Sequence, residues 1–518
     1  MENVSPEFQA AVYAPVRRTA ASVTFDISDV TAADDATELV TSEAEISRKE
    51  QLTNQRLDRP AYATFEEDYW KLDGSFVLPP KVTEPGFEVG WYSAAMSGAD
   101  GVFSPHQVME FTFTAPHSSI GITITFDMPA NEYAVDFDIV VYDGAGAIIK
   151  SIPVTGNTMS RYVIDREQLF EYRRIVVTLK KWCKPNRRAK VTEVSFGVVR
   201  EYGDDQLIKL NLIEEISPTS DTVPANELKF TVDNSSREFN ILNPDGSYKF
   251  LQQRQAATVQ FGVEISPGVF EYVGAGYYFL TDWQSDEGSL TTTFTARNRI
   301  DFIPSVEVEN LTPGSTTLHA LALSIISAAG ITNYRLDPAL TSITTQGVYK
   351  KQTYRQLMQN IAIAGQCAMF VDREDFLCII RLPSGSPVDT IDFDNVYREP
   401  QIRLDKLVTR VEVAYYSGET VTGTHVLTGL TDGGATLKVE NTLINSLQHA
   451  EDVAAWVMAE SNNRALYEVN WRQNPALECA DIVTIEDTYG ANKTSRIVGQ
   501  EYEYAGYLSG KTKSKGAV

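Results

Sequence analysis

Apolar and polar residues alternate in short segments through much of the first 200 residues. From Ser119 to Asp127, isoleucine or phenylalanine occupies every second position, and Val135 to Val141 repeats this period of two. The residues from Asp143 to Gly146 tolerate positive φ, which indicates a tight turn before the next strand. Similar alternation occurs at Ile175–Leu179 and Val191–Val199. Strands separated by turns, without helical patterns between them, predict an antiparallel β-sandwich.

Helical periodicity occurs only in the second half of the chain. From Leu318 to Ala329, apolar residues recur at intervals of three and four behind a Ser-Thr cap at 315–316, and Gly330 stands where the helix would end. Thr353 caps a second such pattern, and a third runs from about Ser446 to Arg464. Strand-like runs separate these helices, so we expect this half to be α+β.

Changes in composition divide the chain. Residues 1–57 are rich in Ala, Thr, Asp and Glu and contain two candidate strands, Ala21–Ile27 and Ala44–Leu52. At Arg59-Pro60 the sequence becomes aromatic and rich in Pro and Gly, and the earlier composition returns near Asp204. Because the ends of a domain often lie close together, this order predicts a sandwich inserted between strands of one host domain.

Length and charge narrow the class of protein. A chain of 518 residues is long enough for three or four domains, and 43% hydrophobic with 10% aromatic residues indicates globular domains. The formal charge of -24 argues against broad neutralisation of phosphates, so we expect no sequence-specific binding of nucleic acid. It is compatible with a wall that nucleic acid passes without adhering.

Membrane and redox signals are weak. The longest weakly charged stretch is 310–334, and its apolar core is too short to span a bilayer. The first 18 residues lack the basic and apolar regions of an export signal. The four cysteines are too few for a disulfide scaffold. Cys367 and Cys378 flank a predicted hairpin turn at Asp372–Asp375 and could face each other, but we favour buried free thiols.

The common catalytic signatures are missing from the sequence. There is no Gly-x-Ser-x-Gly elbow, no pair of histidines four residues apart, and no glycine-rich loop with the spacing of a phosphate site. Glu66-Glu67-Asp68 is the most suggestive carboxylate group, but adjacent strand residues point to opposite faces, and we favour a solvated face. We therefore expect no enzyme, no catalytic residue, no metal site and no cofactor.

Aromatic residues of segment 60–200 are the candidate binding residues. Trp70, Trp91, Tyr92 and Trp182 are candidates for glycan binding, because flat aromatic faces stack on sugar rings. The alternative, favoured for the group as a whole, is that these rings fill the sandwich core or its contact with the host domain.

Basic residues surround Trp182, which is unusual in this acidic chain. They could meet an anionic wall polymer or an acidic neighbouring subunit, and we favour the subunit. The basic strip consists of Arg173, Arg174, Lys180, Lys181, Lys184, Arg187, Arg188 and Lys190.

Several segments resemble baseplate hub proteins of phages, also known as tail-associated tail-tip proteins. The resemblance covers about 1–57 and 204–518, and residues 60–200 separately resemble a galactose-binding-like jelly roll. Its motifs are packing and turn signatures rather than catalytic ones. They are Leu207–Pro218, Pro224–Asn234, Asn243–Gly246, Gln255–Ile265, Gly276–Leu280 and Trp283 for the first barrel; Ala329–Tyr334 and Thr353–Ala364 for the middle domain; and Leu407–Tyr416, Trp471–Glu478, Asp481–Val483 and Gly506–Gly510 for the second barrel.

The resemblance implies a mainly β fold with an α+β part. We expect two hub β-barrel domains, a small α+β middle domain and an inserted β-sandwich of jelly-roll type. The implied divisions are 1–57 and 203–310 for the two parts of the first barrel, 58–202 for the inserted sandwich, 311–400 for the middle domain, and 401–518 for the second barrel with a helix.

The resemblance also implies a function. Such a hub forms a homotrimeric ring that joins the sixfold tail tube and distal tail ring to threefold tip components, around a channel for DNA and the tape-measure protein. Tip fibres or receptor-binding proteins would be further partners, cell-wall glycan would be a ligand of the inserted domain in host attachment, and the chain would belong to the virion after assembly in the host cytoplasm. The competing hypothesis is a carbohydrate-binding or carbohydrate-active adhesion protein whose working part is the jelly roll.

Overall fold

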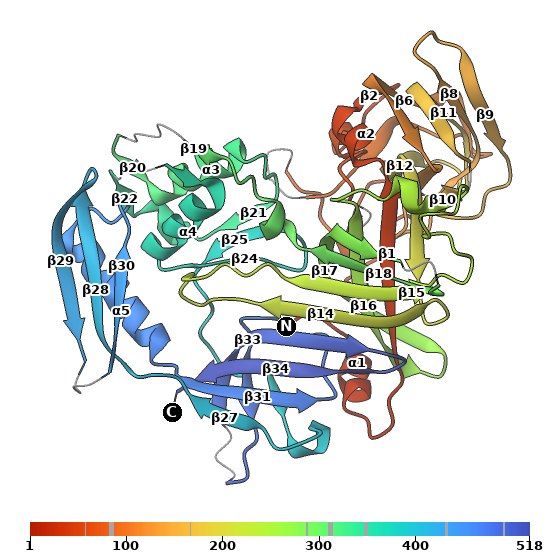
Figure 1. Ribbon diagram of the computed structural model, residues 1–518. Helices are drawn as coiled ribbons and strands as arrows, with labels where there is room; N and C mark the ends of the chain where they lie inside the picture. Colours follow the sequence, from red (N-terminus) through yellow and green to blue (C-terminus); the bar gives the residue numbers. More distant parts are fainter. Residues whose placement is uncertain are drawn as a thin grey trace.

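The protein is mainly β, with helices concentrated in one lobe. The computed structural model describes residues 1–56, 59–81, 87–165, 167–285, 288–308, 314–346, 351–429, 434–489 and 493–517. Figure 1 shows a central sheet that runs through the lower half of the molecule, a sandwich above it on the right and an α+β lobe on the left. The expectation of a mainly β fold with an α+β part is confirmed.

The central sheet has 13 strands among the described residues and is built from both ends of the chain. Its first half curves around one apolar core that includes Phe25, Phe230 and Phe294. This half consists of β13 (Gly197–Tyr202), β1 (Thr19–Ser28), β16 (Ala256–Ser266), β17 (Val269–Gln284), β18 (Thr291–Arg297), β15 (Glu227–Asp233) and β14 (Leu207–Glu215), in that order.

The second half of the sheet continues from β14 without a break. Leu210 to Glu215 pair antiparallel with Gly499 to Tyr504, so hydrogen bonds of the backbone join the two halves. A separate core around Trp471 and Val483 lies under this half. Its elements are β33 (Lys493–Tyr504), β34 (Leu508–Gly516), β31 (Ala465–Trp471), β27 (Gln401–Leu404), β32 (Ile482–Ile485) and β26 (Asp389–Ile391), with α1 (Pro6–Val12) packed on β16.

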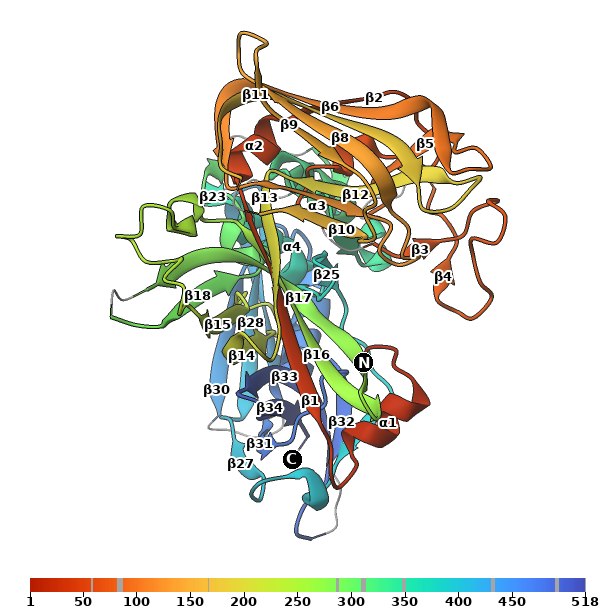
Figure 2. The ribbon, with the colours of Figure 1, turned by 90° about the vertical axis from the view of Figure 1, so that its right-hand side faces the viewer.

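The predicted sandwich consists of two sheets around a core that includes Trp91, Phe126 and Trp182. Figure 2 shows it standing above the central sheet, with the long strand β1 leading up to it. The five-stranded sheet is β2 (Thr37–Val40), β6 (Val102–Ser119), β11 (Leu169–Trp182), β8 (Ala134–Tyr142) and β9 (Ile148–Val154). The four-stranded sheet is β10 (Arg161–Ile164), β7 (Ile122–Phe126), β12 (Arg188–Ser195) and β5 (Trp91–Met96), and α2 (Val30–Asp35), β3 (Ala61–Tyr62) and β4 (Phe76–Val77) lie beside them.

The sandwich joins the central sheet through two neighbouring strand ends. Strand β1 ends at Ser28, and Ser28 lies opposite Gly197, the first residue of β13. The chain therefore leaves the central sheet and returns to it at one cross-strand pair. In this pairing, Thr37–Val40 belongs to the sandwich, and Gly197–Tyr202 belongs to the central sheet, whereas the predicted division at 57/58 and 202/203 assigned them the other way.

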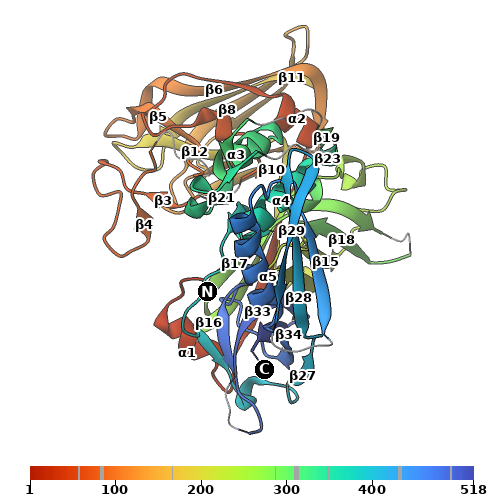
Figure 3. The same cartoon turned by 90° about the vertical axis from the view of Figure 1, so that its left-hand side faces the viewer.

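The α+β lobe combines the three predicted helices with short sheets. Its core runs without interruption from α3 and α4 into β28 and α5, which Figure 3 shows lying side by side. The lobe contains α3 (Leu318–Ala328), α4 (Tyr354–Ala364), α5 (Leu447–Ser461), β21 (Tyr334–Leu336), β24 (Ala368–Val371), β25 (Leu377–Ile380), β28 (Val408–Ser417), β29 (Thr420–Thr428) and β30 (Ala435–Glu440). Two-stranded pairs join β19 (Glu307–Val308) to β23 (Gln352–Thr353) and β20 (Thr316–Thr317) to β22 (Thr344–Thr345).

Most local predictions are confirmed, and two are wrong in detail. Thr353 caps α4, as the sequence predicted, and it forms a complete capping box with Gln356. Residues Ala44–Leu52, predicted as a strand, form turns and a single 3₁₀ turn. The alternation at 119–127 predicts a strand with one buried face, but both faces of β7 are buried. The 3₁₀ turn at 49–51 is η1 (Lys49–Gln51). The other 3₁₀ segments are η2 (Ser247–Phe250), η3 (Arg299–Phe302), η4 (Pro338–Thr341) and η5 (Phe393–Asn395).

The paired ends of the sandwich predict a clean excision. Replacing 29–196 by Asn-Gly should leave a soluble, folded chain in which β1 and β13 form a hairpin, because Asn-Gly favours the two-residue turn that joins opposed antiparallel residues. Size-exclusion chromatography and circular dichroism test this result.

Excision of 58–202 is the matched control. It removes β13 and leaves β2 without its partner β6, so we expect it to be far less soluble. Equal solubility of the two variants, or insolubility of the first alone, would contradict the conclusion that the sandwich joins the central sheet at Ser28 and Gly197.

Candidate functional site

The hairpin turn Asp372–Asp375 between β24 and β25 joins the α+β lobe to the rest of the molecule. The Asp372 carboxylate accepts hydrogen bonds from the backbone N–H groups of Glu374 and Phe376, at 3.0 and 2.9 Å, which fixes the turn locally. Asp375 takes a left-handed conformation with φ of 62°. The turn thus points the side chains of Arg373 and Asp375 in different directions, toward separate parts of the protein.

Arg373 binds both halves of the central sheet. Its guanidinium forms a two-pronged contact with Glu214 of β14, at 2.9 and 2.8 Å. It also donates to the carbonyl oxygens of Pro475 and Leu477 and to the Tyr502 hydroxyl. Burial by itself lowers the pKa of Arg373, but the Glu214 carboxylate raises it well above its ordinary value. Arg373 and Glu214 therefore form a buried, hydrogen-bonded ion pair where β14, the 475–477 loop and β33 meet.

Asp375 binds the sandwich and the first half of the sheet. Its carboxylate, which is fully buried, lies 3.0 Å from Nη1 of Arg56, a residue from the sandwich side. It also accepts from Nε of Arg299 in η3 at 3.0 and 3.1 Å. The guanidinium of Arg56 lies 4.3 Å from the centre of the Tyr277 ring of β17. One short turn therefore connects the α+β lobe, the central sheet and the sandwich through three ion pairs.

A second set of buried charges lies within the sandwich, around β12. Nζ of Lys190 lies 2.9 Å from Glu66 and 3.5 Å from Glu132. Glu132 also accepts hydrogen bonds from Nε of Arg187 at 3.0 Å and from the Trp182 indole N–H at 3.1 Å. Burial alone raises the pKa of Glu132, but the cations, Lys190 first, bring it below its ordinary value. These charges satisfy one another inside the domain.

This cluster determines which side chains of segment 64–70 face inward. Glu66 is buried on Lys190, and the Tyr69 ring lies 4.2 Å from Nζ of the same lysine. Phe65 is fully exposed, and the Trp70 side chain is 44% exposed. The solvated-face interpretation of Glu66-Glu67-Asp68 is therefore wrong for Glu66, because its carboxylate is the counter-ion of a buried lysine.

Three of the four candidate glycan-binding residues lie in the interior. Trp91, Tyr92 and Trp182 have at most 1% of their surface exposed. The Trp91 indole donates to the Ser42 carbonyl at 2.8 Å, and the Tyr92 hydroxyl accepts from Arg59. A ring without exposed surface cannot stack on a ligand, so these three take the core role that the sequence left as the alternative. Of the four candidates, only Trp70 presents its ring to solvent.

The basic strip is largely neutralised within the sandwich. Lys180 pairs with Asp138 at 2.6 Å and Arg174 with Glu110 at 2.7 Å. Arg187 and Lys190 are buried in the cluster around Glu132. Its contact with an acidic neighbouring subunit stays a prediction, and the exposed cations available for that contact are fewer than the sequence suggested.

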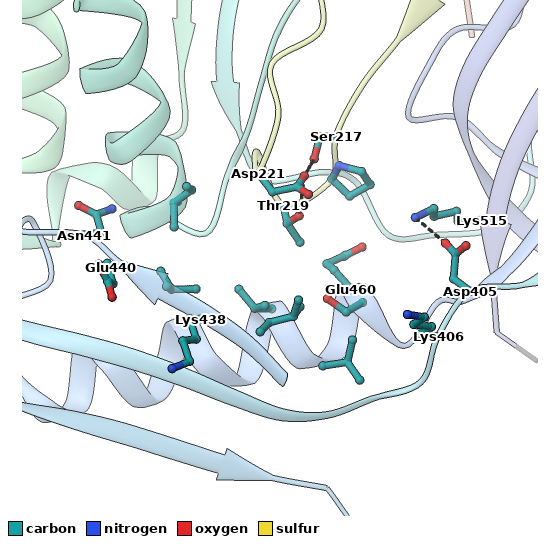
Figure 4. A pocket seen from close by; sticks show the side chains of 17 residues that line it. Ser217, Thr219, Asp221, Asp405, Lys406, Lys438, Glu440, Asn441, Glu460 and Lys515 are labelled. Carbon is teal, nitrogen blue, oxygen red and sulfur yellow. Dashed lines mark hydrogen bonds and ion pairs between the residues drawn. The ribbon is translucent and has the colours of Figure 1, made fainter. Parts of the chain in front are cut away.

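A groove that the sequence did not predict separates the β28–β30 sheet from the residues after β14. Its volume is about 480 Å³, and Figure 4 shows the side chains that line it. Asp405, Lys406 and Lys515 lie at one end, and Lys438 and Glu440 lie at the other. The apolar lining residues are Pro218, Ile363, Val408, Leu437, Val439 and Val457.

Metal-ligating groups and reactive thiols would be further candidate sites. Within them, no group of three or more His, Cys, Asp or Glu side chains could hold a metal ion, and no helix is long and apolar enough to cross a membrane. The four cysteines are free thiols, and Cys367 and Cys378 do not pair. Burial raises the pKa of Cys367 to about 12, so this thiol is not a reactive nucleophile near neutral pH.

Comparison with known proteins gives structural neighbours only. No protein-family model matches the chain, and no curated protein matches it in sequence. The chain is similar to a tail protein from Neisseria meningitidis MC58, with a TM-score of 0.45, 12% identity, and coverage of 61% of this chain and 93% of that one. It is also similar to the 43 kDa tail protein of prophage MuSo2 from Shewanella oneidensis, with a TM-score of 0.43, 14% identity, and coverage of 61% and 94%.

The chain is also similar, over a third of its length, to a chitosan-binding module. The neighbour is chitosan-binding module 1 from a chitosanase/glucanase of Paenibacillus sp. IK-5, with a TM-score of 0.20, 14% identity, and coverage of 33% of this chain and 98% of that one. Tail proteins and a carbohydrate-binding module are thus both among the structural neighbours.

The junction predicts a large loss of stability on removal of Arg373. Arg373→Met leaves the Glu214 carboxylate buried without its cation, and we expect the free energy of unfolding to fall by about 3–5 kcal/mol. Urea denaturation measures this change.

Arg335→Met is the matched control, because Arg335 is half-exposed and pairs with Asp372 and Glu374 of the same turn. We expect a loss of at most about 1 kcal/mol there. Glu214→Leu combined with Arg373→Met should recover much of the stability. Equal losses for Arg373→Met and Arg335→Met would contradict the joining role of the buried pair.

Alanine substitutions of buried and exposed tryptophans should differ in their effect on stability. Trp91→Ala and Trp182→Ala should each destabilise the protein by about 3–5 kcal/mol, because each leaves a cavity in the sandwich core. Trp70→Ala should stay within about 0.5 kcal/mol of the parent. Thermal melting of the three variants measures the difference, and a similar loss for Trp70→Ala would show that its ring also supports the fold.

Proposed function

We propose that the chain is a structural component of a phage tail, acting as the baseplate or tail-tip hub. The observation that carries the proposal is the continuous central sheet, in which backbone pairing of β14 with β33 joins its two halves into one body. The contacts of Asp372–Asp375 add the remaining lobes to this body. A connected body with several projecting lobes suits a protein that holds larger components in fixed positions. The resemblance of 1–57 and 204–518 to phage hub proteins implies a protein of this kind.

In this proposal three copies form a closed ring around an axial channel. The ring would join the sixfold tail tube and distal tail ring to threefold tip fibres or receptor-binding proteins. DNA and the tape-measure protein would leave through the channel during ejection. The charge of -24 supports this role, because an acidic wall repels phosphates and does not retain a passing duplex.

The proposed location is the tail tip of the virion, after assembly in the host cytoplasm. The inserted sandwich would be an accessory module for host attachment that binds cell-wall glycan. The exposed ring of Trp70 supports this part, since it is the candidate that can still stack on a sugar. No catalytic step is proposed, because the sequence lacks the common catalytic motifs and the buried charges of the sandwich neutralise one another.

A carbohydrate-binding or carbohydrate-active adhesion protein is the second candidate function. The exposed aromatic residues of the segment 65–70 favour it. In that case the central sheet and the α+β lobe would be only a scaffold for the sandwich.

Copy number in the intact particle separates the two functions. We expect a reconstruction of the purified tail to contain three copies of the chain at the tip, around an open axial channel. One copy or six copies would contradict the hub. A monomer that binds wall glycan and is missing from purified tails would support the adhesion protein instead.

A further inference from the structure

The groove of Figure 4 follows the free edge of strand β30. In the three-stranded sheet β29-β28-β30, strand β30 pairs with β28 alone among the described residues. Five consecutive residues, 437–441, line the groove. Side chains of a strand alternate between two faces, so consecutive residues line one groove only where it runs along the strand's edge. The unpaired N–H and C=O groups of β30 are therefore accessible from the groove.

The groove has the side-chain pattern that an added strand would need. Leu437 and Val439 are half-buried and point toward the α+β core, whereas Thr436, Lys438 and Glu440 are exposed. Together with Val457 of α5, the first two form an apolar lining below the edge. A strand placed beside β30 could insert every second side chain into this lining, while its backbone paired with the edge.

Opposite charges stand at the two ends of the groove. Lys406 lies close to the start of β30, because Val408 is the parallel partner of Ala435. Glu440 is the last residue of β30. Both side chains are exposed, and neither forms an ion pair with any described residue. The neighbouring Asp405 is already paired with Lys515 at 3.1 Å, and Glu460 with Arg496 at 2.9 Å.

We propose that this groove binds an extended peptide segment of a partner protein, which adds to β30 as an antiparallel strand. Antiparallel pairing is the more stable arrangement, and it sets the direction of the charges. A basic residue at the start of the segment meets Glu440, and an acidic residue at its end meets Lys406. Apolar side chains at every second position between them lie against Val439 and Leu437.

The peptide Lys-Val-Thr-Val-Thr-Val-Thr-Glu is a direct probe. With its lysine opposite Glu440, its first two valines lie opposite Val439 and Leu437. Fluorescence anisotropy of the labelled peptide with the full chain should show saturable binding. The charge-reversed peptide Glu-Val-Thr-Val-Thr-Val-Thr-Lys should bind about three- to tenfold more weakly, because two exposed ion pairs become two repulsions.

Charge exchange in the protein makes the test specific. Lys406→Glu and Glu440→Lys should each weaken binding of the first peptide, and the double variant should prefer the charge-reversed peptide. Lys209→Glu is the matched control, since Lys209 is an exposed lysine on β14 outside the groove lining and its reversal should leave the peptide preference unchanged. All four variants alter exposed residues, so they should fold, and melting curves verify this.

Hydrogen exchange tests the pairing itself. Bound peptide should slow exchange of amides in 435–440, and N-methylation of the peptide on its pairing edge should abolish binding. The proposal is overturned if neither peptide binds saturably, if binding survives N-methylation, or if the double variant keeps the original preference. It fails independently of the hub function, because copy number in the tail does not depend on this groove.

Discussion

The buried pair of Arg373 and Glu214 is the contact on which the arrangement of the lobes depends. Taking both charges out of water costs several kcal/mol per ion, and this cost is offset only when every donor has a partner. Each nitrogen of the Arg373 guanidinium has a partner, and these partners are one carboxylate, two backbone carbonyls and one hydroxyl from separate parts of the chain. The geometry is thus correct only when β14, the 475–477 loop and β33 are all in place, so the pair makes the native arrangement specific as well as stable.

The sandwich is held in a different way. Its two covalent links to the central sheet start from one cross-strand pair, Ser28 and Gly197. Arg56 adds a contact at another point, because it reaches Asp375 and the Tyr277 ring. The internal stability of the sandwich comes from its own core and from the charges around Lys190. Position and stability therefore have separate physical origins in this lobe, so the sequence inside the sandwich can change without altering the central sheet.

Sequence patterns predicted local structure well because local structure depends on near neighbours. The alternation at 135–141 and the capping residue Thr353 each act within a few positions, and both predictions are confirmed. The contacts of Arg373 could not be predicted, because Glu214 is 159 residues away and nothing in the hairpin turn indicates its partner. Trp70 and Trp91 both lie in turn-rich sequence, and only the buried charges beneath segment 64–70 explain why one ring is outside and the other inside.

The junction of β14 and β33 has a consequence for synthesis of the chain. Asn211 and Glu501, whose side chains form a hydrogen bond across this junction, are separated by 290 residues. At about 5–20 residues per second, the ribosome needs about 15–60 s to produce the partner of β14. During that interval β14 is an open sheet edge, whereas the sandwich already has all its strands. We therefore expect the sandwich to fold on the ribosome and the central sheet to close only after β33 has been synthesised, with chaperones shielding the open edge of β14 until then.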